Sequence, residues 1–203
     1  MKAFALTLVL SAIWLVAPVI AEEPSPNEVI ESAVTLLAEK LDGRQEELAA
    51  DRPTLYALID EILLPRFDRK FAAQMVLARN WTGADTAQRE RFIEGFYQAL
   101  LRRYADGLLE FKQDRVKVLP FRGDLSKPRA MVRSTVAMND GRKIAVDYEL
   151  VKRSSGWQMF NVVIEGISYI RNYRTELDAE IRSSSLDAVI DRLEEEAGIP
   201  NDG

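Results

Sequence analysis

Two residue types are missing from the 203-residue chain, which contains no cysteine and no histidine. Without cysteine there are no thiolate nucleophiles, disulfide bonds, iron–sulfur clusters or thiolate zinc sites. Without histidine there is no Ser-His-Asp triad and no imidazole to act as an acid or base near neutral pH. Carboxylates, tyrosine, lysine and arginine are the groups that remain for catalysis or metal binding. An enzyme with this sequence would have few types of side chain available for catalysis.

Positive charge is also in short supply. The chain has 27 Lys and Arg against 32 Asp and Glu, which gives a formal net charge of −5. An acidic chain repels the phosphate backbone of nucleic acids, so we expect no nucleic-acid partner. The hydrophobic share of 47% is ordinary for a folded protein and excludes wholesale disorder. The length suits a single domain.

The first 21 residues are typical of a secretory signal peptide. Lys2 supplies a short basic region, residues 3–17 form an uncharged apolar run, and Val19-Ile20-Ala21 places compact residues where a signal peptidase reads the chain. The alternative is an uncleaved anchor, but the run is shorter than the ~20 residues that span a bilayer. We therefore expect a cleaved signal peptide at 1–21 and an exported domain at 22–203.

Apolar residues three and four positions apart predict that residues 25–111 are helical. Ser25 suits the cap of the first helix, with Glu28 three residues later to complete a capping box. The longest helical segment extends from Thr86 to about Phe111. Its aromatic-rich stripe recurs every fourth residue, at Phe92, Phe96, Leu100, Tyr104 and Leu108. Such a stripe is most often an ordinary part of a hydrophobic core.

The spacing of apolar residues changes from helical to alternating between residues 114 and 165, which predicts a sheet. Asn139-Asp140-Gly141 is typical of a hairpin turn. The clearest alternation puts one apolar set on a single face, at Ile144, Val146, Tyr148 and Leu150. The run from Trp157 to Ile164 is apolar on both faces, so we expect it to be covered on both.

Helical spacing returns over residues 167–197. Helices, then a meander of strands, then helices predict an α+β fold in one domain. We expect a four-stranded antiparallel sheet packed by about six or seven helices.

The carboxylates form no pattern typical of a catalytic or metal site. The clearest cluster, Glu194-Glu195-Glu196, falls on the polar side of an amphipathic helix, which predicts a solvated face. The chain has no glycine-rich phosphate loop, no EF-hand loop and no cluster with metal-ligand spacing. We therefore predict no catalytic residue and no metal site. The abundant apolar side chains either pack into a closed core or enclose a cavity, and periodicity favours neither arrangement.

Several strings, in the order found here, resemble a known family. They are Leu64-Pro65-Arg66-Phe67-Asp68, Val146-Asp147-Tyr148, residues 157–168 (WQMFNVVIEGIS) and Asn172-Tyr173-Arg174. Together with the signal peptide they resemble the MlaC/toluene-tolerance (Ttg2-type) family of periplasmic phospholipid-binding proteins. The resemblance spans most of the mature chain. It departs at Ala78, Asn161 and Leu177, where that family usually has Gly, Asp and Phe, and none of these changes removes apolar lining.

The resemblance implies a sheet packed by helices, similar to nuclear-transport-factor-like folds, with a deep apolar pocket for acyl chains. It implies a periplasmic phospholipid carrier that is not an enzyme and needs no cofactor besides its cargo. Its partners would be an outer-membrane lipoprotein complex and an inner-membrane ABC transporter complex with its substrate-binding subunit. The role would be to maintain the lipid asymmetry of the outer membrane.

Ten residues are candidates for the lining of such a pocket, on the longest helix, the sheet and the start of the C-terminal helices. They are Phe96, Leu100, Tyr104, Val146, Tyr148, Phe160, Val162, Ile164, Ile167 and Ile170. Which face of the strands points to lipid stays open at this stage.

Two other functions compete with a carrier. Nuclear-transport-factor-like folds also host isomerases that use a carboxylate and a tyrosine in an apolar pocket, so Asp147 or Glu165 would have to meet Tyr104 or Tyr173. The third interpretation is a structural module with a closed core.

Overall fold

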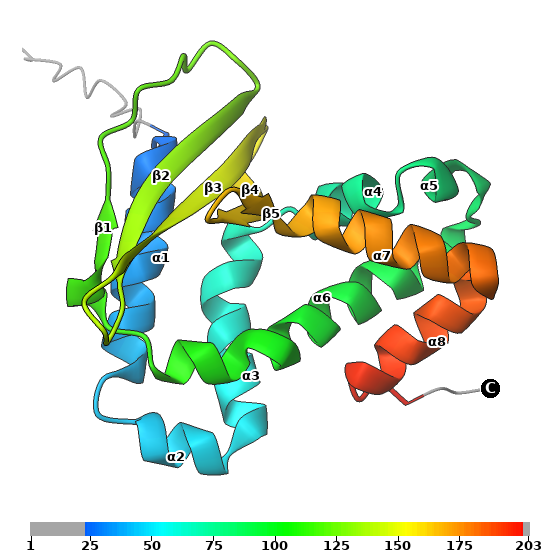
Figure 1. Ribbon diagram of the computed structural model, residues 1–203, viewed down its shortest axis with the longest axis horizontal. Coiled ribbons are helices and arrows are strands. Elements are labelled where there is room, and N and C mark those ends of the chain that lie inside the picture. The colour runs from blue at the N-terminus through cyan, green and yellow to red at the C-terminus, as the bar shows by residue number, and fades with distance from the viewer. Residues whose placement is uncertain (1–22, 201–203) are drawn as a thin grey trace, which may run out of the picture.

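The computed structural model describes residues 23–200, which form an α+β arrangement with one antiparallel sheet (Figure 1). The expected signal peptide at 1–21 lies outside the described residues. The helices are α1 (Pro26–Leu41), α2 (Gln45–Ala50), α3 (Arg52–Leu63), α4 (Arg69–Leu77), α5 (Arg79–Gly83), α6 (Thr86–Leu109), α7 (Tyr169–Ser183) and α8 (Leu186–Glu196), with two short 3₁₀ turns, η1 (Leu64–Arg66) and η2 (Gln113–Arg115). The strands are β1 (Val116–Val118), β2 (Arg129–Ala137), β3 (Lys143–Arg153), β4 (Gly156–Ile164) and β5 (Ile167–Ser168), paired in that order.

The predicted α+β class is confirmed, but the described residues contain five strands and eight α-helices. The additional strand β5 lies where the sequence predicted the start of a helix. Glu165 and Gly166 have φ angles of 50° and 80°, so the chain reverses in two residues and pairs Ile167 with Ile164. Two successive positive φ angles are the geometry of a tight hairpin turn. Helical spacing alone could not reveal this reversal.

The ends of the long helices are set by local side chains. The Ser25 backbone N–H donates to Glu28 Oε2 at 2.7 Å and the Ser25 hydroxyl accepts from the Glu28 N–H, which confirms the expected capping box of α1. Asp85 and Gln88 form the same box at the start of α6. Ala78, at the junction of α4 and α5, has a φ of 47°, a conformation that suits glycine better than alanine.

One face of the sheet is defined by directly opposed pairs. Tyr148 lies opposite both Val132 and Val162, and Val146 lies opposite Ile164, so these five side chains share a face. Helix α1 packs against this face (Figure 1). The α1 core, as we call it, consists of Ile30, Val34, Ala130, Val132, Leu150 and Trp157.

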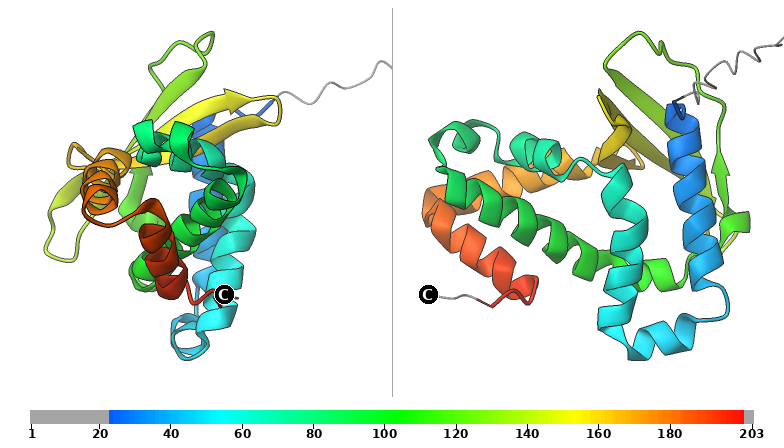
Figure 2. Two further views of the ribbon diagram at one scale, coloured as in Figure 1. Left: turned by 90° about the vertical axis from the view of Figure 1, so that its right-hand side faces the viewer. Right: turned by 180° about the vertical axis from the view of Figure 1, so that it is seen from behind.

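Two further clusters of buried residues complete the interior. One joins α2, α3, the end of α1 and the second half of α6. The other joins α4, α7, α8 and the first half of α6 with Val151 and Phe160 of the sheet. Trp157 and Phe160 are both buried on β4, as expected for a strand covered on both faces. The views in Figures 1 and 2 show the sheet and α1 on one side of α3, with α4, α5, α7 and α8 on the other, while α6 crosses α3 between the two sides.

The prediction that the Glu194–Glu196 cluster is solvated is wrong for Glu194, which is buried. Its carboxylate accepts from Arg91 Nε at 2.9 Å across the contact between α6 and α8. Gly95 allows the close approach, because an added Cβ there would lie 3.4 Å from Glu194 Cγ. A buried carboxylate needs such a partner, and sequence spacing did not show that α6 supplies it.

Candidate functional site

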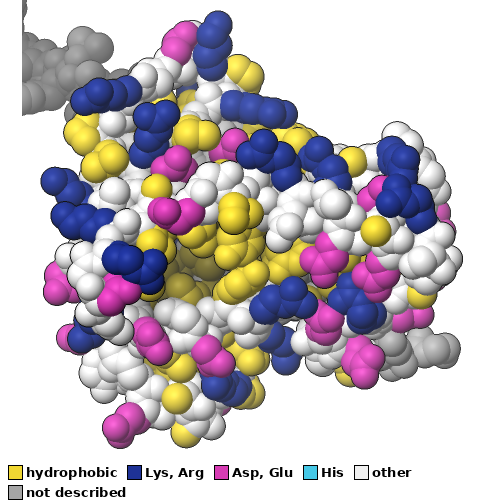
Figure 3. Space-filling view, viewed as in Figure 1, with side chains coloured by type: hydrophobic (Ala, Val, Ile, Leu, Met, Phe, Trp, Pro, Cys, Tyr) yellow, Lys and Arg dark blue, Asp and Glu magenta, His cyan; other side chains and the backbone are white. Residues whose placement is uncertain are grey.

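A cavity of about 340 Å³ opens between α3, α6, β4 and the start of α7. Figure 3 shows a hollow with hydrophobic walls near the centre of one face of the molecule. Seventeen residues form its wall: Ile59, Leu63, Phe67, Phe96, Tyr97, Leu100, Leu101, Tyr104, Leu108, Met159, Phe160, Asn161, Val162, Ile164, Tyr169, Ile170 and Tyr173. None of these carries a charged side chain.

The walls belong to all three core clusters, so the hollow lies where those clusters would otherwise merge. Contacts between neighbouring elements hold the walls in place. Tyr97 on α6 donates to Asp60 Oδ1 on α3 at 2.7 Å, and the rings of Phe96 and Tyr173 meet edge to face with centroids 5.3 Å apart. The Asp68 N–H donates to the Met159 carbonyl at 2.8 Å, which fixes Phe67 beside β4.

An empty cavity of this size would strongly lower the stability of the fold. Sealed and empty, about 340 Å³ would lower stability by roughly 8 kcal/mol at about 24 cal/mol per Å³. That is comparable to the whole stability of a typical domain. A fold that keeps this hollow among apolar walls is suited to an apolar occupant.

Asn161 is the one non-aromatic polar residue of the wall, and its amide is fully used within the protein. Its Nδ2 donates to Glu149 Oε2 at 2.6 Å and to the Ser168 hydroxyl at 2.9 Å, and its Oδ1 accepts the Ile170 N–H at 3.1 Å. Asn161 therefore fastens β4 to the start of α7. A neutral amide suits this position because an aspartate would face the Glu149 carboxylate.

Tyr97 and Tyr104 of the wall are neutral at physiological pH. Burial, followed by the hydrogen bond to Asp60, raises the pKa of Tyr97 above its ordinary value. Burial raises the pKa of Tyr104 to about 12. Neither is ready to act as a base. The wall as a whole can exclude water from an apolar ligand, and its hydroxyls can serve as hydrogen-bond donors or acceptors.

The structure places seven of the ten predicted lining residues in the wall: Phe96, Leu100, Tyr104, Phe160, Val162, Ile164 and Ile170. Val146 and Tyr148 share the sheet face of Val162 but are not part of the wall, and Tyr148 packs against the α1 core. Ile167 is 61% exposed on β5, outside the wall, because the Glu165-Gly166 turn carries it to the surface. The prediction that these three line the cavity is therefore corrected.

Sequence reasoning missed the contribution of α3 and of the residue that follows η1, namely Ile59, Leu63 and Phe67. Their spacing is that of any core helix, and only tertiary packing shows that they face β4 across a gap. Tyr97 and Leu101 follow directly after the stripe residues Phe96 and Leu100. A wider reading of the apolar face of α6 would have included them.

The carboxylate–tyrosine pairs expected for an isomerase, Asp147 or Glu165 with Tyr104 or Tyr173, are not formed in the described residues. Asp147 lies between Arg133 and Val163 in the pairing register, and Glu165 accepts the Ala145 N–H. Neither is part of the wall, and the Tyr104 and Tyr173 hydroxyls contact each other at 3.1 Å.

Residues 23–200 contain no group of three acidic side chains arranged to hold a metal ion. No helix among them combines the length and the apolar character needed to cross a bilayer.

Comparison with known proteins gives a consistent picture. The family model described as MlaC protein matches residues 31–195. The toluene tolerance protein ttg2D of Pseudomonas putida is 29% identical over 187 residues, which cover 91% of this chain and 86% of that protein. The intermembrane phospholipid transport system binding protein MlaC of Haemophilus influenzae is 22% identical over 199 residues, which cover 96% and 92%.

A solved structure shows the same fold. The phospholipid-binding protein of Ralstonia solanacearum, determined in complex with a phospholipid, matches with a TM-score of 0.77 and 24% sequence identity. The match covers 86% of this chain and 98% of that chain.

Proposed function

The chain belongs to the MlaC family, and from this premise we propose that it is a phospholipid carrier. The acyl chains of the lipid occupy the cavity between α3, α6, β4 and α7, and the headgroup stays at the mouth. The observation that carries the proposal is the hollow of about 340 Å³ whose wall has no charged side chain. The phospholipid named for the relatives is the ligand that such a wall suits.

The energetics favour a cavity over a polar site. Each methylene exposed to water costs about 0.8 kcal/mol, so a diacyl lipid needs apolar shelter worth on the order of 20 kcal/mol. A few hydrogen bonds, each worth about 1 kcal/mol, cannot replace it. An apolar hollow provides this shelter in water, which explains why the chain has abundant apolar surface and few catalytic groups.

The wider role in our proposal is transport through the periplasm. The expected signal peptide would export the chain, and the carrier would exchange lipid with an outer-membrane lipoprotein complex and an inner-membrane ABC transporter complex. The outcome would be maintenance of outer-membrane lipid asymmetry. The family membership and the name of the Haemophilus relative support this role.

Native mass spectrometry of the purified protein tests the binding step. We expect the wild type to retain phospholipid. Ile164→Glu, which puts a charge into the wall, should reduce the bound fraction at least tenfold, because a buried unpaired carboxylate is strongly unfavourable beside acyl chains.

Ile167→Glu is the matched control, because Ile167 pairs with Ile164 in the same hairpin yet is exposed. It should retain lipid at the wild-type level. Wild-type protein without lipid after purification and after incubation with phospholipid vesicles would refute the proposal. Equal lipid in both variants would refute the assigned cavity.

A further inference from the structure

Three tyrosines of the cavity wall meet at its mouth, where Tyr104 is exposed to solvent. We call Tyr104, Tyr169 and Tyr173 the rim tyrosines. The rings of Tyr104 and Tyr169 meet edge to face at 5.5 Å, and Tyr104 is 41% exposed although it lines the cavity. The Tyr173 hydroxyl lies 3.1 Å from the Tyr104 hydroxyl and accepts from Arg103 Nη1 at 3.2 Å.

The direction of this chain of hydrogen bonds follows from burial. A guanidinium can only donate, so Arg103 donates to Tyr173. Tyr173 is only 7% exposed, and a buried hydroxyl hydrogen needs an acceptor. Tyr104 provides that acceptor, and the exposed Tyr104 hydroxyl can turn its own hydrogen toward a group outside the protein. The chain from Arg103 through Tyr173 therefore ends in a donor at the mouth.

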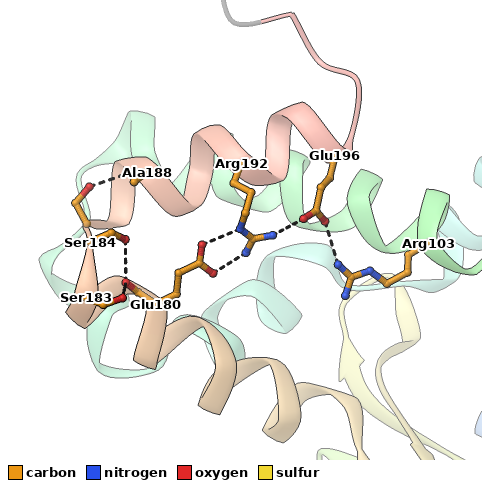
Figure 4. A network of polar contacts seen from close by, with 8 residues as sticks. Arg103, Glu180, Ser183, Ser184, Ala188, Arg192 and Glu196 are labelled. Carbon is orange, nitrogen blue, oxygen red and sulfur yellow. Dashed lines mark hydrogen bonds and ion pairs between the residues drawn. The ribbon is translucent and has the colours of Figure 1, made fainter.

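Arg103 is held in place from the side of α8. Its Nη2 donates to Glu196 Oε2 at 3.1 Å, and Glu196 also accepts from Arg192. Arg192 in turn forms two 2.7 Å hydrogen bonds with Glu180 on α7 (Figure 4). This network fixes the guanidinium behind the rim. A hydrogen-bond chain that starts at a cation polarises each following hydroxyl and strengthens its final donor.

We propose that Tyr104 donates this hydrogen bond to the phosphodiester of the bound lipid and so selects phospholipid over neutral diacylglycerol. The inference rests on the proposed function, because tails inside the cavity bring the phosphate to the mouth. The wall has no carboxylate to repel an anion there. Arg103 and Tyr173 are positioning residues that act through Tyr104.

A competition experiment tests the selectivity. Lipid-free protein is incubated with equimolar phosphatidylglycerol and diacylglycerol of identical acyl chains, and native mass spectrometry gives the ratio of the two complexes. A hydrogen bond to a charged group predicts a preference of about tenfold or more for the phospholipid in the wild type. Tyr104→Phe, which keeps the ring and removes the hydroxyl, should reduce that ratio to near one.

Tyr56→Phe is the matched control. Arg102 lies over the Tyr56 ring, 4.9 Å from its centroid, but Tyr56 is not part of the cavity wall. This variant should keep the wild-type ratio. Arg103→Met should lower the ratio without lowering total lipid, a result that a merely structural role would not give.

Two outcomes would overturn the inference while leaving the carrier function intact. One is a wild-type ratio near one with normal lipid binding, and the other is a Tyr104→Phe ratio equal to that of the wild type. Millimolar inorganic phosphate distinguishes a lipid-borne phosphate from a free anion. We expect it to leave the ratio unchanged, and a collapse of the ratio would show a site for the free anion instead. Loss of both lipids from the wild type would instead refute the proposed function.

Discussion

The sheet face that contains Val132, Tyr148 and Val162 is covered in two ways. At one end α1 packs directly against β1, β2 and β4, and Val132 and Leu150 of the α1 core are fully buried. At the other end α6 packs against α3, α4 and α8, and a cavity separates it from β4. Both ends are lined by aliphatic and aromatic side chains. The distance at which the covering helix is held, rather than the kind of residue, decides which end is filled.

That distance is set by the contacts of α6 with other helices. Tyr97 joins α6 to α3 through Asp60, and Arg91 joins α6 to α8 through Glu194. Helix α6 is therefore packed on other helices, which hold it away from the sheet. The hollow is a consequence of strong packing around it.

Matched leucine truncations should show the largest difference between the two ends. Leu150→Ala in the α1 core should lower the free energy of unfolding by about 2–5 kcal/mol, because Leu150 is fully buried and its loss leaves a cavity. Leu100→Ala in the cavity wall should cost the lipid-free protein under about 1 kcal/mol, since space is already present there. Urea denaturation of both variants provides the comparison. Equal losses would show that the wall of the hollow is packed like the α1 core.

Removal of the lipid should lower the stability of the end of the sheet that faces the cavity and leave the α1 end unchanged. Ligand at a hundredfold excess over its dissociation constant stabilises a protein by about 2.7 kcal/mol. For a domain of this size the melting temperature of stripped protein should fall by about 5–10 °C. Differential scanning calorimetry measures the shift, with removal confirmed by mass spectrometry. Identical melting temperatures before and after stripping would contradict a lipid-filled cavity.

Asn161→Asp tests the contact that joins β4 to the start of α7, and it should have the smallest effect on stability. The new carboxylate would face Glu149 and lose two donated hydrogen bonds, which predicts a loss of about 1–3 kcal/mol at pH 7. Burial and Glu149 would raise the pKa of the new group, so the variant approaches wild-type stability at low pH and loses it as the pH rises.

The second substitution Glu149→Gln should restore most of that loss, because the Gln amide can donate to the new carboxylate. Thermal melts from pH 4 to pH 8 test both variants. A pH-independent loss, or no rescue, would show that the Glu149–Asn161 contact does not fasten β4 to the start of α7.

Sequence periodicity predicted which side chains of a single element share a face, whereas the cavity itself was implied by the family resemblance. The four-residue spacing of α6 identified Phe96, Leu100 and Tyr104, and the alternation of β4 identified Val162 and Ile164. These residues share a face whatever packs against it. The α+β class followed from the same local patterns.

The remaining features depend on contacts between distant segments. Tyr148 has the same alternation as Val162, but it lies opposite Val132 and packs against the α1 core. Ile59 and Leu63 reach the cavity only because α3 stands beside α6. Ile167 was misplaced because a two-residue turn at Glu165-Gly166 reverses the chain. Periodicity does not encode these relations.

A crystal structure of the protein as purified, without added lipid, tests the central claim most directly. We predict continuous tail-shaped electron density between Leu100 on α6, Val162 on β4 and Ile170 on α7, with a headgroup at the mouth beside Tyr104. A cavity closed by the protein's own side chains, or one that contains only water, would contradict the account.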